Sequence, residues 1–237
     1  MTDKEVIILA GGFGTRLREV VGDLPKSLAP INDKPFLCYL ISYLQKYGVN
    51  RFIFSLGYKN DLIVTYIREF HPEIEAIFVV EDSPLGTGGA IKEALKISKS
   101  ENILVVNGDT YFDFNLNDFY EKASLGQFPF TIALLKIENN YRYGFVELDE
   151  KNEIIRFCEK QESNNVFINT GFYIINKEQV NFDTNKDIFS LEKDFFESDL
   201  RKIKLYGIEF NNEFIDIGIP DDFNRAQTLF KQLNINN

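Results

Sequence analysis

A glycine-rich stretch near the start of the chain could bind phosphate. Residues 9–17 read LAGGFGTRL and follow an apolar segment typical of a buried strand. Glycines allow the backbone to approach a bulky anion, so that its N–H groups can point at phosphate oxygens. Arg16, and Lys26 in the segment Pro25-Lys26-Ser27, add two cations that a plain turn would not need. We interpret this stretch as a triphosphate-binding loop whose expected contacts are Leu9, Ala10, Gly11, Gly12, Gly14 and Thr15.

The spacing of these glycines differs from two common nucleotide-binding motifs. It matches neither the Gly-x-Gly-x-x-Gly pattern of dinucleotide-binding enzymes nor the P-loop pattern Gly-x-x-x-x-Gly-Lys-Ser/Thr. The sequence therefore disfavours both a Rossmann-type dehydrogenase and a P-loop NTPase.

Two aspartates stand where a metal ion would be needed beside such a loop. Asp109 ends the run Asn107-Gly108-Asp109 after a strand pattern, and Asp216 opens the run Asp216-Ile217-Gly218-Ile219-Pro220. Mg²⁺ is commonly held by one or two carboxylates, with substrate phosphates and water completing the octahedron. Aspartate is also common in turns that bind no metal. In combination with the glycine loop, the two aspartates favour a Mg²⁺ site.

The composition limits the partners of the chain. Its 237 residues carry a formal net charge of −10, which argues against nucleic acid or an acidic membrane as a partner. No apolar run approaches the roughly 18 residues of a membrane span, and no secretory signal pattern is present. Cys38 and Cys158 are too few for a disulfide framework, so we expect buried thiols in a reducing cytoplasm. The single histidine, His71, is expected at a helix end, which leaves none for general-base chemistry.

Strand and helix patterns alternate in the first half of the chain. Apolar periodicity predicts strands at 6–9, 51–55, 76–80 and 102–106 and helices at 36–47, 61–70 and 88–98. This alternation predicts parallel βαβ units in a doubly wound sheet, with ligands beyond the carboxyl ends of the strands.

The second half is predicted to extend that sheet in antiparallel fashion. Strand patterns at 130–136, 144–148, 153–159 and 166–175 are separated by short polar turns. A further strand at 214–217 precedes a closing helix at 220–233. The expected fold class is α/β, with a mixed, mainly parallel sheet and an antiparallel β extension.

Taken together, the motifs resemble the sugar-1-phosphate nucleotidylyltransferases. The loop and the aspartates are joined, in family order, by Pro25-Lys26-Ser27-Leu28-Ala29-Pro30, Lys34-Pro35, Leu85-Gly86-Thr87-Gly88-Gly89-Ala90, Tyr143-Gly144, Glu159-Lys160 and Asn169-Thr170-Gly171. The sequences of these motifs are most similar to those of guanylyltransferases acting on manno-configured heptose 1-phosphates. The resemblance implies one Rossmann-like catalytic domain over 1–237, with residues 1–115 for the nucleotide and 116–237 for the sugar phosphate. It also implies that the C-terminal β-helix of longer relatives is missing.

The resemblance further implies roles for individual residues. Arg16 would clamp the β- and γ-phosphates, Lys26 would neutralise charge on the α-phosphate, and Lys160 would bind the sugar phosphate. Asp109 and Asp216 would hold Mg²⁺. The other implied contacts are Gly86, Thr87 and Gly108 with the nucleotide and Gly144, Glu159, Asn169 and Thr170 with the sugar phosphate. No general base is required to activate the nucleophile, because a phosphate monoester with a second pKa of about 6 is already ionised at neutral pH.

Glu81 suggests which nucleobase of the nucleotide is bound. Uridylyl and thymidylyl relatives tend to carry Gln at this place, and Gln can both donate to and accept from a pyrimidine edge. An ionised Glu only accepts, which suits the two adjacent donors of guanine. Glu81 therefore favours GTP, although a solvated acid at a strand end is the simpler alternative.

The resulting hypothesis is a cytoplasmic, Mg²⁺-dependent enzyme. It would join GTP to a sugar 1-phosphate, giving a GDP-sugar for surface polysaccharide synthesis and pyrophosphate, with no nucleic-acid or membrane partner. Mannose 1-phosphate as acceptor, a pyrimidine triphosphate as donor and a non-catalytic nucleotide-sugar sensor remain alternatives. The sequence leaves homo-oligomerisation open.

Overall fold

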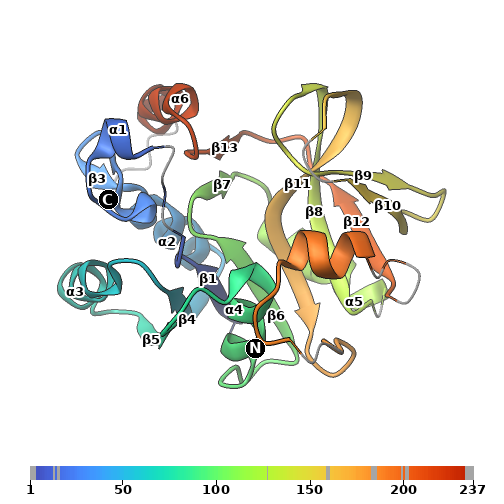
Figure 1. Ribbon diagram of the computed structural model, residues 1–237, viewed down its shortest axis with the longest axis horizontal. Helices are drawn as coiled ribbons and strands as arrows, with labels where there is room; N and C mark the ends of the chain where they lie inside the picture. Colours follow the sequence, from blue (N-terminus) through green and yellow to red (C-terminus); the bar gives the residue numbers. More distant parts are fainter. Residues whose placement is uncertain are drawn as a thin grey trace.

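The structure is a computed structural model that describes residues 4–12, 14, 17–126, 128–158, 161–182, 186–198, 200 and 203–232. Its centre is the parallel part of a large sheet (Figure 1). Strand β1 (Lys4–Leu9) pairs in parallel with β4 (Val49–Leu56) on one side and with β6 (Asn102–Asn107) on the other. Strand β5 (Glu75–Val80) extends the sheet beyond β4. After β1 the chain adds β4 and β5 on one side of β1 and then β6 on the other side. This reversal creates a topological switch point between β1 and β6.

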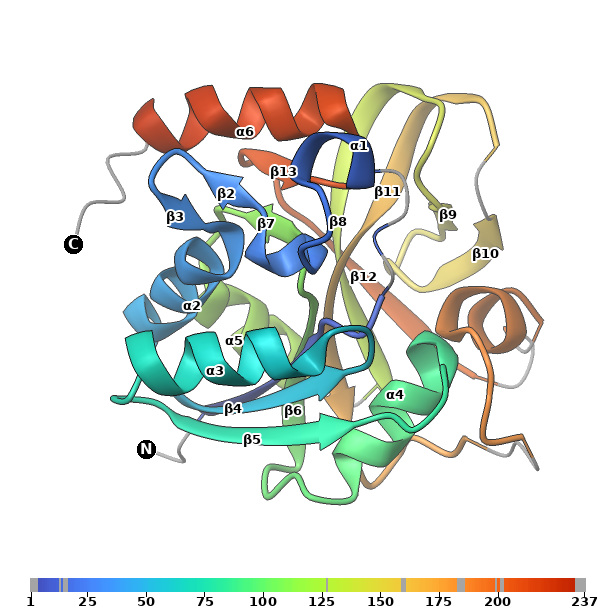
Figure 2. The same ribbon diagram turned by 60° about the vertical axis from the view of Figure 1, so that its left-hand side comes forward.

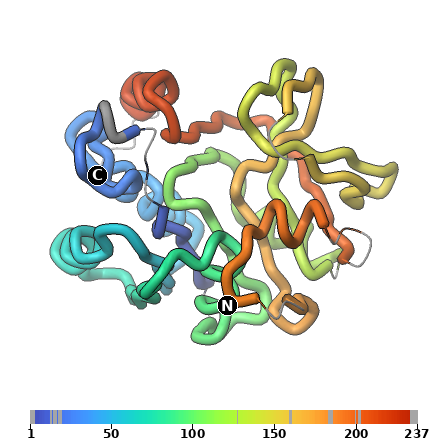
Figure 3. The backbone as a smooth tube through the Cα atoms, in the orientation of Figure 1, coloured from blue at the N-terminus to red at the C-terminus, as the bar shows by residue number. Residues whose placement is uncertain are grey.

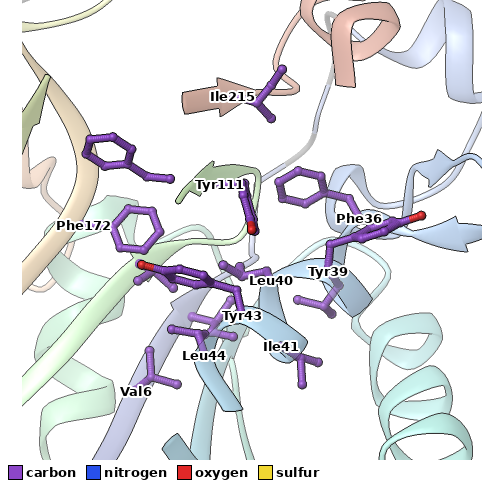
Figure 4. Close-up of a cluster of buried hydrophobic side chains, with 14 of the residues drawn as sticks. Val6, Phe36, Tyr39, Leu40, Ile41, Tyr43, Leu44, Tyr111, Phe172 and Ile215 are labelled. Carbon is purple, nitrogen blue, oxygen red and sulfur yellow. The ribbon is translucent and has the colours of Figure 1, made fainter. Parts of the chain in front are cut away.

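Helices cover both faces of these strands because the strand residues are apolar on both sides. Val6 and Ile8 of β1 pack in the cluster that includes helices α2 (Phe36–Lys46) and α3 (Asn60–Phe70). Ile7 points the other way, toward α4 (Gly86–Leu95). Figure 4 shows the first of these clusters, in which aromatic rings of α2 meet Tyr111 and Phe172. Two of these tyrosines keep hydrogen-bonded hydroxyls, since Tyr43 donates to the Phe114 carbonyl oxygen and Tyr39 to the Ile31 carbonyl oxygen, both at 2.9 Å.

The antiparallel extension begins at β11 (Ser163–Asn176), which pairs with β6. Strand β11 also pairs with β8 (Phe130–Asn140) and, near residue 167, with β9 (Phe145–Leu148), which in turn pairs with β10 (Ile154–Cys158). The pairing with β8 shifts register between Asn169 and Tyr173, where Gly171 has φ +77°. This break allows one strand to join the parallel sheet and the extension. The predicted α/β class with its antiparallel extension is confirmed.

Several short elements were not predicted. They are α1 (Arg18–Val21), the 3₁₀ turn η1 (Lys26–Leu28), β2 (Pro30–Ile31), β3 (Lys34–Pro35), β7 (Thr110–Phe112), α5 (Leu116–Gly126), the π-helix η2 (Leu191–Glu197) and β12 (Leu205–Glu209). Strand β12 pairs in parallel with β8, and β7 forms a separate two-stranded ladder with β13 (Phe214–Asp216). The elements of two to four residues lack the length over which apolar periodicity can be read, whereas α5, with 11 residues like α2 and α3, was long enough and was missed.

The helix predicted at 88–98 is displaced toward the N-terminus. Helix α4 starts at Gly86 because the Phe189 carbonyl oxygen, from a distant segment, accepts bonds from the backbone N–H groups of Gly88 (3.1 Å) and Gly89 (3.4 Å). Figure 3 shows that distant segment, coloured orange, running beside the green trace of α4.

The closing helix α6 (Pro220–Gln232) lies over β2, as Figure 2 shows, and the Gln227 side chain accepts a 2.6 Å bond from the Asn32 backbone N–H. The last residue of the predicted helix, Leu233, lies outside the described residues. Among the helices of the described chain, none is both long and apolar enough to cross a membrane.

Candidate active site

A cavity of about 360 Å³ opens at the carboxyl ends of the parallel strands. Every described residue expected to contact the nucleotide lines it, namely Leu9, Ala10, Gly11, Gly12, Gly14, Glu81, Gly86, Thr87 and Gly108. Lys26 and Asp109 line it as well. Thr15 and Arg16 lie outside the described residues. The switch point thus brings four separate sequence motifs to one hollow, as expected for a doubly wound sheet.

The glycine loop is held against the end of β4. The Ala10 N–H donates to the Ser55 carbonyl oxygen at 2.9 Å, and a Cβ added to Gly57 would lie 2.8 Å from the Gly11 carbonyl oxygen. Gly12 differs, because a Cβ there would meet no atom of the described residues within 4 Å. The described part of the protein therefore does not require glycine at position 12, whereas the close approach of a ligand would.

The floor of the site is a cluster of alternating charges. Lys26 Nζ hydrogen-bonds to an Asp109 carboxylate oxygen and lies 3.7 Å from Asp216 Oδ1. Asp216 accepts two further bonds, from Arg142 Nη2 at 2.8 Å and from the Gly218 backbone N–H at 2.8 Å. The same guanidinium also pairs with Asp222. Lys26 thus lies between the Asp109 and Asp216 carboxylates, and Arg142 binds the Asp216 carboxylate.

The β7–β13 ladder explains how aspartates so far apart in sequence meet. Asp216 is paired with Thr110, the residue after Asp109, and the Ile217 N–H donates to the Asp109 carbonyl oxygen at 3.0 Å. Two three-residue strands therefore set the distance between the two carboxylates.

The pKa values of Lys26 and of Asp216 are both raised, for different reasons. Burial lowers the pKa of Lys26, but the Asp109 and Asp216 carboxylates more than offset this and raise it, so the ammonium stays charged. Burial and repulsion from Asp109 raise the pKa of Asp216 against the attraction of Lys26 and Arg142. A further cation beside these carboxylates would relieve that repulsion.

The donor set fits a Mg²⁺ ion bound together with a phosphate substrate. Asp109, which lines the cavity, and Asp216 supply two hard carboxylate groups on either side of Lys26 Nζ, and Mg²⁺ seldom takes more from a protein. Among the described residues no group of three or more His, Cys, Asp and Glu side chains could hold a metal by itself. The remaining ligands would have to come from substrate and water.

Two groups of the site were missed or given no role by the sequence. Arg142 was missed, although a basic residue directly before the Tyr143-Gly144 motif was the available signal. Ser27 stood inside the Pro25-Lys26-Ser27 motif, and its buried hydroxyl has no hydrogen-bond partner among the described residues. An unpaired buried hydroxyl costs free energy, so a ligand that bonds to Ser27 would be favoured.

Glu81 and Thr87 already have partners within the protein. Glu81 Oε2 accepts from the Leu85 N–H at 2.9 Å, and Oε1 accepts from the Ser55 hydroxyl at 3.3 Å. The Thr87 hydroxyl donates to Glu192 at 2.7 Å and accepts from the Leu191 N–H at 2.9 Å. The carboxylate of Glu81 retains unused lone pairs for a base, whereas Thr87 offers a ligand mainly its backbone.

The residues expected to contact the sugar are only partly brought together. The Asn169 N–H donates to the Gly144 carbonyl oxygen at 2.9 Å, so these two positions are adjacent. Thr170 is 1% exposed, and its hydroxyl donates to the Ala133 carbonyl oxygen at 2.7 Å. Its side chain therefore stabilises the sheet and is turned away from any ligand. Glu159 and Lys160 lie outside the described residues.

Comparison with known proteins agrees with this architecture. The family model described as "Nucleotidyl transferase" matches residues 5–232. The chain belongs to the nucleotidyl transferase family. Among curated family members, it is 42% identical to the D-glycero-alpha-D-manno-heptose 1-phosphate guanylyltransferase of Aneurinibacillus thermoaerophilus, over 94% of this chain and 96% of that one. The enzyme of the same name from Campylobacter jejuni is 40% identical, over 92% and 96%.

Other nucleotidyl transferases are more distant. The mannose-1-phosphate guanyltransferase of Debaryomyces hansenii is 33% identical over 94% of this chain but 64% of its own length.

Among solved structures, HddC from Yersinia pseudotuberculosis has a TM-score of 0.85 at 38% identity, covering 96% of this chain and 99% of that one, and it has also been solved with GMP-PN. Membership of this family excludes the dehydrogenase that the glycine spacing had already disfavoured.

Proposed function

We propose that this nucleotidyl transferase moves GMP from GTP to a manno-configured heptose 1-phosphate, releasing pyrophosphate. The observation that carries the chemistry is the Lys26–Asp109–Asp216 cluster at the edge of a cavity lined by the glycine loop. The choice of GTP and heptose is supported by the two guanylyltransferases at 40–42% identity over almost their whole length. Glu81, with acceptor capacity directed at the same cavity, supports guanine.

The reaction needs one bond to form and one to break. A phosphate oxygen of the sugar 1-phosphate would attack the α-phosphorus of GTP, and the bond from that phosphorus to the β-phosphate oxygen would break. Lys26 would neutralise the charge that grows on the α-phosphate, and Arg142 would keep Asp216 oriented. Asp109 and Asp216 would hold Mg²⁺, which when bound supplies positive charge beside the phosphates. The nucleophile is already ionised, so positioning and neutralisation suffice.

Arg16 and Thr15 are proposed for the triphosphate, and Glu159 and Lys160 for the sugar phosphate, on the family resemblance. Gly144 and Asn169 complete that proposed acceptor site, whereas the side chain of Thr170 is left out because its hydroxyl is bound to Ala133. A cytoplasmic location and a role in surface polysaccharide synthesis belong to the same proposal; the two free thiols support the location, and the family resemblance supports the role.

A pyrophosphate-release screen tests the proposal. Four nucleoside triphosphates are crossed with heptose, mannose and glucose 1-phosphates at fixed Mg²⁺, with folded Asp109→Asn protein as the background. We expect turnover with GTP and manno-configured acceptors, fastest with the heptose. Equal turnover with UTP or dTTP would falsify the guanine assignment, and faster turnover with mannose would change the acceptor. Binding of GDP-sugar without turnover of any pair would instead identify a sensor.

A further inference from the structure

One wall of the active-site cavity is bound from outside by a segment remote in sequence. Within residues 81–90, those that line the cavity are Glu81, Pro84, Gly86, Thr87 and Ala90. The remote segment comprises residues 189–192, which include the start of η2, and none of them lines the cavity. Figure 3 shows this segment in orange beside the green trace of α4. The wall is thus shaped partly by residues outside the cavity lining.

Backbone hydrogen bonds connect this segment to Glu81, the residue expected to bind guanine. The Leu85 N–H donates to Glu81 Oε2 at 2.9 Å, and the Leu85 carbonyl oxygen accepts from the Phe189 N–H at 2.9 Å. The Phe189 carbonyl oxygen accepts in turn from the N–H groups of Gly88 and Gly89. Leu85 therefore lies between the Glu81 carboxylate and the 189–192 segment, so a movement of that segment would move the donor that orients the carboxylate.

A side-chain hydrogen bond fixes the 189–192 segment to the nucleotide loop. The Thr87 hydroxyl donates to Glu192 Oε2 at 2.7 Å and accepts from the Leu191 N–H at 2.9 Å. The same oxygen of Glu192 accepts from the Ser190 hydroxyl at 2.9 Å. Hydrogen bonds to an ionised acceptor are stronger than those between neutral groups, and Glu192 is half-buried. Glu192 therefore restrains Thr87 from outside the cavity.

The N-terminus of η2 is capped by other groups. Ser190 Oγ accepts from the Lys193 N–H at 3.2 Å, and Asp194 Oδ2 accepts from the Ser190 N–H at 2.7 Å. Glu192 and Asp194 both stand in the first turn of η2, where an acid stabilises the helix dipole. The two carboxylates differ in their partners: Asp194 bonds to the cap of its own helix, whereas Glu192 bonds across to the nucleotide loop.

We propose that Glu192 is a positioning residue for guanine recognition, acting through Thr87 and Leu85 on the Glu81 carboxylate. This rests on the proposed function, in which Glu81 binds guanine. Guanine presents a ring N–H and an amino group side by side, and a carboxylate accepts from both only when its two oxygens face them. The Leu85 N–H holds one of these oxygens in place. Loss of the Glu192 carboxylate would release the loop and, with it, the orientation of Glu81.

Comparison of GTP with inosine triphosphate, which lacks the amino group of guanine, tests this. Dissociation constants of both nucleotides are measured with the intact protein and with each folded variant. The unaltered protein should prefer GTP about tenfold to a hundredfold, the value of one hydrogen bond to a charged acceptor. Glu192→Met should lower that preference about threefold or more, because misplaced groups lose affinity steeply. Glu192→Gln keeps an acceptor oxygen for the Thr87 hydroxyl and should retain the preference.

Three further variants separate positioning from general loss of structure, which would weaken both nucleotides alike. Thr87→Val should lower the preference as Glu192→Met does, and the double variant should lose no more, because both changes remove the same hydrogen bond. Asp194→Leu, the matched control, should lower Tm and leave the preference unchanged.

Two kinds of result would contradict the proposal. A GTP preference that survives Glu192→Met and Thr87→Val, or one that Asp194→Leu lowers equally, would overturn the role of Glu192 while leaving the guanine assignment intact. If Glu192→Met does not fold, Thr87→Val decides by itself. Equal affinity of the unaltered protein for the two nucleotides would overturn guanine recognition by Glu81, and the role of Glu192 with it.

Discussion

Replacing Gly86 by alanine should damage the nucleotide loop more than the same change at an open glycine. Gly86 has φ +74°, and a Cβ added there would lie 2.5 Å from the Phe189 carbonyl oxygen. Gly48 has a similar φ of +80°, but a Cβ there would meet no atom of the described residues within 4 Å. Both substitutions force an L-residue into the left-handed region, and Gly86→Ala adds a collision with backbone that a side-chain rotation cannot relieve. Gly48→Ala is therefore the matched control.

The expected magnitudes follow from these two terms. The left-handed conformation costs an alanine about 1–2 kcal/mol, which is the full cost at Gly48. Overpacking against a fixed neighbour adds about 1–3 kcal/mol at Gly86. Relief of the collision requires the loop to move away from Phe189, which displaces Gly86 and Thr87 from the cavity wall. Because about 1.4 kcal/mol corresponds to a tenfold change, GTP affinity should fall roughly tenfold or more.

Two measurements check this prediction. Equilibrium urea unfolding gives the free energy of unfolding of both variants, and a GTP titration gives their dissociation constants. We expect Gly86→Ala to be the less stable variant and to bind GTP more weakly, with Gly48→Ala unchanged in affinity. If Gly86→Ala cost no more stability than Gly48→Ala and bound GTP normally, the contact with Phe189 would have no role in shaping the loop.

Five further substitutions test the proposed roles. Asp109→Asn and Asp216→Asn should each lower kcat by orders of magnitude while circular dichroism stays unchanged; near-normal turnover would remove that residue from the metal site. Arg142→Met should raise the Mg²⁺ concentration needed for half-maximal activity, because Asp216 loses its 2.8 Å partner, and an unchanged requirement would contradict this. Lys160→Ala should raise KM for the sugar phosphate about tenfold to several hundredfold, as expected for charge-assisted hydrogen bonds, with GTP affinity preserved in a binding assay. Gly12→Ala should keep Tm, since nothing crowds its Cβ, yet weaken GTP binding; normal binding would argue against close phosphate approach there.

Local pattern determined much of this protein. The apolar runs of β1, β4, β5 and β6 and the amphipathic α2 and α3 could be read from sequence because their periodicity is set by residues close together in the chain. The glycine loop could be assigned to the carboxyl end of β1 for the same reason. Alternation of strand and helix was enough to predict that ligands bind beyond the carboxyl ends of the strands, and the structure brings the loops after β1 and β6 to one cavity there.

Tertiary structure decided the contacts between distant segments. The meeting of Asp109 with Asp216 depends on the pairing of β13, a strand that the sequence predicted at 214–217, with the three-residue β7, which it did not predict. Arg142 acquires its role only through the carboxylates that fold against it. The start of α4 is set by a carbonyl from residue 189, and the Thr170 hydroxyl is turned inward by pairing in β11. Sequence patterns report which residues repeat along the chain, whereas hydrogen bonds and ion pairs between remote segments depend on chain packing that no local period encodes.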